Sequence, residues 1–264
     1  MKILYIGDVM AQPGLDIVSN VLPKLKQKYD IDLVIAQAEN VSDGKGTEED
    51  DYKKLLSLGI DFCSGGNWSL FRQSIYPYFE DPSEPIIRPA NYPKGTPGQE
   101  YKFIEKNNKR ILVVSLLGQV IGRDADKPNQ NPLKKIDEIL LKTINENKDA
   151  IIVNFHGDFS SQKVIIGHYL DGRVSAVIGD HWHVPTADAR ILTNGTAHIS
   201  DVGMCGILNA SLGVSYNSVI PRWRDNIKTK NELETLGPKQ FNAVLITTNN
   251  LLAKSIEPIQ QIID

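Results

Sequence analysis

Short apolar segments that end in a polar side chain recur along this chain, and this recurrence constrains its fold more than any other feature. Ile3–Ile6 is followed by Gly7-Asp8, and the predicted strand Asp32–Ala38 is followed by Glu39-Asn40. Buried strands that alternate with helical segments predict an α/β fold, in which ligands bind at the carboxyl ends of the strands. We therefore expect the polar residues at these strand ends to share one site.

Three more predicted strands end in the same way, and the last carries a pair of histidines. Side chains that alternate along an extended segment point to the same side, so both imidazoles of the pair should converge. Two imidazoles just past a strand end are typical of a metal site. The strands and their polar residues are Ile60–Cys63 with Asn67, Ile151–Val153 with His156, and Ser175–Gly179 with His181 and His183.

The candidate ligands combine hard oxygen donors with neutral imidazoles, which suits iron, manganese or zinc rather than a structural all-sulfur zinc site. Seven donors exceed what one catalytic ion with an open position needs. We therefore expect two ions about 3.5–4 Å apart, bridged by Glu39 or Asp8, which activate a hydroxide and clamp phosphate oxygens for in-line attack. The candidate ligands are Asp8, Glu39, Asn40, Asn67, His156, His181 and His183.

Local patterns predict several other elements of the fold. Helical spacing of apolar residues over Leu15–Leu25 predicts a helix, which Pro23 should kink or restart. Asn194-Gly195 predicts a tight hairpin turn. His168 falls in a predicted helix and His198 in a predicted strand, so we expect structural roles for both.

Composition restricts the partners of the chain. The 264 residues have a formal net charge of -3 and no basic block, which argues against a surface for duplex nucleic acid. No apolar run is long enough to cross a bilayer or to serve as a signal peptide. Cys63 and Cys205 form neither a disulfide framework nor a metal motif. We expect a soluble, cytoplasmic protein with one domain over residues 1–264.

The ordered motifs resemble those of the calcineurin-like metallophosphoesterases, and more closely their YmdB-like phosphodiesterase branch. The resemblance covers nearly the whole chain. It implies a four-layer α/β/β/α sandwich of two facing sheets with a dinuclear centre of iron or manganese. It also implies hydrolysis of phosphodiesters, with 2′,3′-cyclic nucleotides as the leading substrates. The motifs are Gly7-Asp8, Ala38-Glu39-Asn40, Gly66-Asn67, His156, Gly179-x-His181-x-His183, and the segments 88–93, 95–98, 186–188 and 201–204.

Carried over by position, the resemblance divides the ligands between the two ions. Glu39 becomes the bridge between them. The resemblance also implies a homo-oligomer, although no interface is evident in the sequence. One ion would be held by Asp8, Glu39, Asn40 and His183, and the other by Glu39, Asn67, His156 and His181.

The chain departs from the family pattern at Trp68, where the family has a histidine that donates a proton to the leaving oxygen. An indole N–H donates a hydrogen bond but is no acid near neutral pH, and losing a positioned acid typically costs on the order of 10²–10⁴ in rate. Nearby, Asn154 replaces an aspartate, Gly157-Asp158 replaces Ala-Glu, and Asp180 and Trp182 replace threonines.

Two functions are compatible with this departure. We expect an active phosphodiesterase of reduced rate or shifted substrate, in which Asp158, Asp180 or a metal-bound water replaces the usual acid. The alternative is a catalytically weakened or inactive metal-binding protein that senses nucleotides or binds a protein partner. Trp68 and Trp182 would then offer stacking surfaces for a base, each worth roughly 1–3 kcal/mol.

Overall fold

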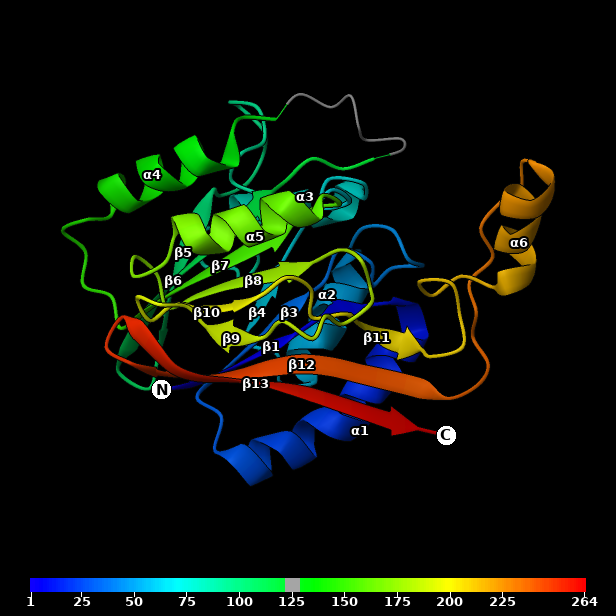
Figure 1. The fold of residues 1–264 in the computed structure, drawn as a ribbon, viewed down its shortest axis with the longest axis horizontal. Helices are drawn as coiled ribbons and strands as arrows, with labels where there is room; N and C mark the ends of the chain where they lie inside the picture. The colour runs from blue at the N-terminus through cyan, green and yellow to red at the C-terminus, as the bar shows by residue number, and fades with distance from the viewer. Residues whose placement is uncertain (122–128) are drawn as a thin grey trace.

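The computed structural model describes residues 1–121 and 129–264, and its strands form two sheets (Figure 1). The first sheet has the order β2-β11-β12-β1-β3-β4, with β13 paired to β12. Its strands are β1 Lys2–Ile6, β2 Asp8–Val9, β3 Leu33–Gln37, β4 Phe62–Ser64, β11 Met204–Ile207, β12 Lys239–Asn249 and β13 Leu252–Ile263. The second sheet has the order β5-β6-β7-β8-β10-β9. Its strands are β5 Tyr101–Lys106, β6 Lys109–Leu117, β7 Ala150–His156, β8 Ala176–Asp180, β9 Arg190–Ile191 and β10 Ala197–Ile199.

Alternation of side chains along the strands explains how the two sheets share a core. In β1, Ile3 and Tyr5 join an apolar cluster with Val113 and Ile178 of the second sheet. Leu4 and its neighbours on the opposite face join a different cluster with the helices. Because both faces are covered, the central strands read as continuous apolar runs in the sequence.

Helices cover the outer face of each sheet. The first sheet packs against α1 Ala11–Tyr29, α2 Glu49–Ser57 and α3 Tyr76–Glu80, and the second against α4 Pro132–Lys142 and α5 Ser160–Tyr169. The predicted α/β/β/α sandwich is therefore confirmed. Helix α6, Tyr216–Asp225, projects away from both sheets (Figure 1). No helix among the described residues is long and apolar enough to span a membrane.

Two local predictions have different outcomes. The Asn194-Gly195 hairpin is confirmed, because β9 and β10 pair antiparallel around a glycine with φ of +99°. Of the kink or restart predicted at Pro23, the restart is wrong, since α1 is continuous through it. Pro23 and Ser19 are both exposed, so water can satisfy the Ser19 carbonyl that the proline leaves without a donor.

The parallel pairing of the strands brings the polar strand ends together. β1, β3 and β4 are parallel neighbours, so Asp8, Glu39 and Asn67 follow adjacent strands at one edge of the first sheet. In the second sheet β7 and β8 are also parallel, with His156 in register with Asp180. The candidate ligands thus gather at the carboxyl ends of both sheets.

Candidate metal centre

One group of candidate ligands surrounds His156. Ligand atoms of Glu39, His156 and His181 all lie within 4.8 Å of one another. His156 Nε2 is 2.9 Å from Glu39 Oε1 and 3.0 Å from Asn67 Oδ1. Glu39, Asn67 and His156 are buried, whereas His181 is partly exposed. The group is therefore accessible to solvent at His181.

The other three candidates form a second group next to the first. Asn40 Nδ2 lies 2.9 Å from Asp8 Oδ1 and 3.2 Å from His183 Nε2. His183 Nε2 lies 3.6 Å from Asp8 Oδ1. The groups are joined because the His181 backbone N–H donates to Asp8 Oδ2 over 3.3 Å. The structure thus brings all seven sequence-predicted residues into two adjacent groups.

Hydrogen bonds at Nδ1 leave Nε2 of His156 and of His183 able to bind a metal ion. His183 Nδ1 lies 3.2 Å from the Leu212 carbonyl, which only accepts, so Nδ1 carries the proton. His156 Nδ1 lies 2.7 Å from Asp180 Oδ1 and donates to that carboxylate. In the neutral ring each Nε2 then presents a lone pair to the ligand group.

The environment of Glu39 shows whether the residues present fit a cation. Its Oε1 is completely buried and has no hydrogen-bond partner among the described residues, although it lies 2.9 Å from His156 Nε2. A buried oxygen of this kind is costly unless a donor or a metal ion compensates it. The residues present therefore fit a metal ion.

The electrostatics of the site favour positive charge. Burial alone would lower the pKa of His156, but attraction to Glu39 and Asp180 outweighs it and holds that pKa well above its ordinary value. Burial would raise the pKa of Asp8, but the charge of His183 outweighs it and holds that pKa below its ordinary value. The pKa of His183 is raised in turn, because Asp8 outweighs its burial. A metal ion would replace protons that the carboxylates otherwise attract.

Two histidines of the site have positive φ angles, and the backbone at Gly66 lies too close to the ligands for any side chain. His181 and His183 have φ of +106° and +61°, a strained region for residues other than glycine. A Cβ on Gly66 would lie 2.5 Å from both Glu39 Oε2 and His156 Cδ2. The Gly66-Asn67 motif therefore permits the close approach of ligands from both sheets.

Trp68, where the resemblance leads us to expect the proton donor, supports the site through its backbone. Its N–H donates to Glu39 Oε2 over 2.8 Å. Its ring packs edge-on against Phe71, with centroids 5.2 Å apart, and the Lys45 ammonium lies 5.1 Å from the ring centroid. The side chain thus packs beside the centre without offering an acid.

Neither neighbouring carboxyl group is arranged to replace that acid. Asp158 Oδ2 lies 3.2 Å from His181 Nε2 and accepts from the Ile121 N–H over 2.7 Å. Burial acts to raise the pKa of Asp158, but its hydrogen bond with His181 outweighs it and leaves that pKa below its usual range. Asp180 is fully buried and accepts from several donors at once. Asp158 is therefore held as a carboxylate, and the oxygens of Asp180 are already engaged as hydrogen-bond acceptors.

Sequence reasoning missed the part that Asp180 plays as the hydrogen-bond partner of His156. No local sequence pattern indicates this partnership, because it depends on the parallel register that pairs β7 with β8. It also missed the buried pair of Lys163 and Asp201, 2.8 Å apart. Asp201 Oδ2 accepts from the Trp182 N–H over 2.8 Å, and the Lys163 ammonium lies 4.5 Å from the Trp182 ring. This pair anchors the loop that carries His181.

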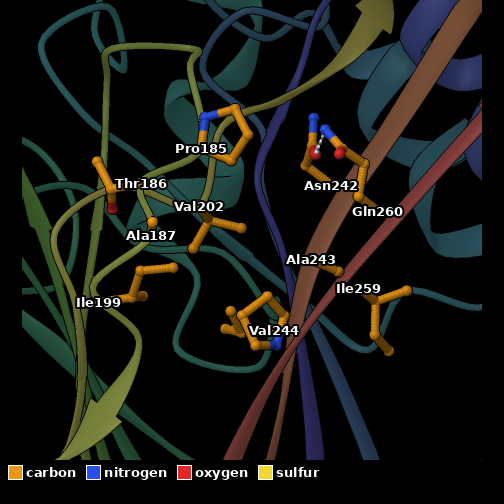
Figure 2. Close-up of a pocket in the computed structure, with 11 residues that line it drawn as sticks. Pro185, Thr186, Ala187, Ile199, Val202, Asn242, Ala243, Val244, Ile259 and Gln260 are labelled. Carbon is orange, nitrogen blue, oxygen red and sulfur yellow. Dashed lines mark hydrogen bonds between the residues drawn. The ribbon is translucent and has the colours of Figure 1, made fainter.

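A separate pocket lies between the loop after β8 and strands β12 and β13 (Figure 2). Its volume is about 270 Å³, and Val202, Val244 and Ile259 give it a mainly apolar lining. Gln260 donates to Asn242 at one end of it, over 3.1 Å. None of the candidate metal ligands lines this pocket, so it is distinct from the metal centre.

A sandwich of two sheets with imidazoles, carboxylates and amides gathered at the strand ends defines a metallophosphoesterase of calcineurin-like architecture. Within that class the chain belongs to the YmdB-like family, whose model matches residues 4–259. The resemblance noted from the motifs is thereby confirmed.

Relatives of the chain match over nearly its whole length. It is 36% identical over 257 residues to the 2′,3′-cyclic-nucleotide 2′-phosphodiesterase of Bacillus subtilis, covering 97% of this chain and 95% of the relative. A novel phosphatase from Mycoplasma pneumoniae superimposes with a TM-score of 0.91 at 30% identity, covering 99% of this chain and 93% of the other. A hypothetical protein from Thermus thermophilus has a TM-score of 0.90 at 35% identity, covering 99% of both chains.

Proposed function

We propose that this protein is a metal-dependent phosphodiesterase that hydrolyses small phosphodiesters, with 2′,3′-cyclic nucleotides as the substrate class. The relative from Bacillus subtilis carries that activity in its name and matches over 97% of this chain. The observation within the chain that best supports the proposal is the buried Glu39 Oε1, which lies 2.9 Å from His156 Nε2 in the group of candidate ligands with His181.

The proposed ligands serve two ions, iron or manganese by resemblance, with zinc sharing the same donors. Asp8, Asn40 and His183 would hold one ion, and Asn67, His156 and His181 would hold the other. Glu39 would serve both ions. When bound, such a pair supplies a hydroxide nucleophile and neutralises charge on the phosphate oxygens.

The residues around the ligands orient them and limit which substrates react. Leu212 and Asp180 fix the rings of His183 and His156. The Trp68 N–H holds Glu39 in place. Because position 68 offers no acid, the leaving oxygen takes its proton from solvent. Hydrolysis should therefore be fastest for good leaving groups.

The alternative is a metal-binding regulator that has lost hydrolysis, and the indole at position 68 favours it. The discriminating experiment is hydrolysis of 2′,3′-cyclic AMP and of an activated aryl phosphodiester by manganese-loaded protein. Turnover of either substrate that disappears in Asp8→Asn supports the enzyme. A wild type that binds metal but turns over neither substrate refutes the enzyme and supports the regulator.

A further inference from the structure

We propose that Asp180 is a positioning residue for the metal centre, and that the ion held by His156 depends on its carboxylate. The inference rests on the two-ion centre of the proposed function and adds a residue outside the ligand set.

The geometry fixes Asp180 between the two sheets. Its Oδ1 accepts from His156 Nδ1 over 2.7 Å, across the register that pairs β7 with β8. Its Oδ2 accepts from three donors on three strands. These donors are the Tyr5 hydroxyl at 2.9 Å, Gln37 Nε2 at 3.0 Å and Asn154 Nδ2 at 2.6 Å. With both oxygens engaged from both sheets, the carboxylate cannot turn away from His156.

The Asp180 carboxylate pairs with His156 rather than with a nearby lysine. Both side chains are fully buried, and among the described residues the ion pairs of this carboxylate involve His156. The Lys163 ammonium bonds the Asp180 backbone carbonyl and pairs with Asp201 instead. A buried carboxylate without a full counter-charge is costly. The cost is offset when the histidine it orients carries a metal ion.

An asparagine at position 180 could not replace the carboxylate. A carboxylate accepts at both oxygens, whereas an amide has one accepting oxygen and one donating nitrogen. If the amide oxygen accepts from Tyr5, Gln37 and Asn154, its NH₂ group faces His156 Nδ1. His156 must then shift its proton to Nε2, where it occupies the position that a metal ion needs.

The test is zinc binding by Asp180→Asn, measured as zinc ions retained per chain against graded concentrations of a competing chelator. The variant should hold one of the two ions about 10–100-fold more weakly. The ion assigned to Asp8, Asn40 and His183 should keep its affinity. Asp188→Asn is the matched control, because Asp188 accepts from the Thr186 and Ser200 hydroxyls, both over 2.6 Å, and lies outside the ligand groups. It should bind zinc like the wild type.

A second readout can be made on the wild type alone. It distinguishes a carboxylate that orients the His156 ring from one that only stabilises the fold. In zinc-loaded wild type, NMR should show an exchange-protected His156 Nδ1–H proton shifted far downfield by its short bond to a carboxylate. In Asp180→Asn that signal should disappear. Absence of the signal from zinc-loaded wild type overturns the inference, even if Asp180→Asn fails to fold.

Three further results would also overturn it. They are wild-type zinc affinity at both sites of Asp180→Asn, an equal loss at both sites, and a wild type that binds no zinc. Neither readout uses a substrate. A wild type that binds two zinc ions but hydrolyses no phosphodiester therefore refutes the proposed function and leaves the role of Asp180 supported or refuted on its own evidence.

Discussion

Replacing Trp68 with histidine should raise the hydrolysis of substrates that have poor leaving groups. Residue 68 directly follows Asn67, and its backbone already bonds Glu39, so the new imidazole starts beside the ligand group. A positioned acid contributes on the order of 10²–10⁴ in rate, or about 2.7–5.4 kcal/mol of barrier. We therefore expect a gain of that order for 2′,3′-cyclic AMP, whose leaving oxygen is an alkoxide.

The structure indicates that the substitution is tolerated. Histidine is smaller than tryptophan, and the indole is half-buried against Phe71 and Lys45. Loss of the edge-on contact with Phe71 should cost about 0.5–1.5 kcal/mol of stability. Thermal unfolding of Trp68→His checks this cost.

The assay compares initial rates of manganese-loaded wild type, Trp68→His and Trp68→Phe on two substrates. An activated aryl phosphodiester should gain much less than 2′,3′-cyclic AMP, because its leaving oxygen needs no proton. Trp68→Phe keeps the aromatic packing without an acid and should show no gain. Equal rates for Trp68→His and wild type on both substrates, in folded and metal-loaded protein, would refute the reasoning.

Three further predictions concern the ligands and the stability of the fold. Asp8→Asn and His181→Ala should lose metal and any hydrolysis together, as metal analysis and rate assays on the same preparations will show; full hydrolysis in both variants would place the activity elsewhere. Gly66→Ala should fold but lose metal, because its Cβ would lie 2.5 Å from Glu39 Oε2, and unchanged metal content would contradict this. Burial is the main cause that lowers the pKa of His198, so the unfolded chain binds that proton first, and the contribution of His198 to stability should fall as pH drops below about 6.5 by up to about 1.4 kcal/mol per pH unit. In chemical denaturation between pH 7 and 5.5, the stability of wild type relative to His198→Gln should therefore fall with pH, and identical pH dependence of the two proteins would contradict the assignment.

Much of the fold was predictable because the strand signal and the ligand signal coincide in this sequence. Strands β1, β3 and β7 are buried along most of their length and lead into polar residues, so apolar runs such as Ile3–Ile6 locate both the strand and its candidate ligand. The course of α1 through Pro23 was not predictable, because it depends on which face of the helix meets solvent.

The hydrogen bonds and ion pairs around the candidate ligands could not be predicted from the sequence. Asp180 and Asp158 both looked like candidate acids, since spacing does not reveal hydrogen-bond partners. Their roles follow from strand register and burial, which place Asp180 behind His156 and Asp158 beside His181. Likewise, the pairing of Lys163 with Asp201 joins segments far apart in the chain and has no local pattern.

The most direct test of the account is the rate of 2′,3′-cyclic AMP hydrolysis as manganese is added to chelator-stripped wild type. The account predicts a rate that is negligible without metal, rises with manganese and saturates near about two ions per chain. The same titration of Asp8→Asn should stay at the background rate. Retention of only trace manganese, or hydrolysis that does not depend on metal, would contradict the account.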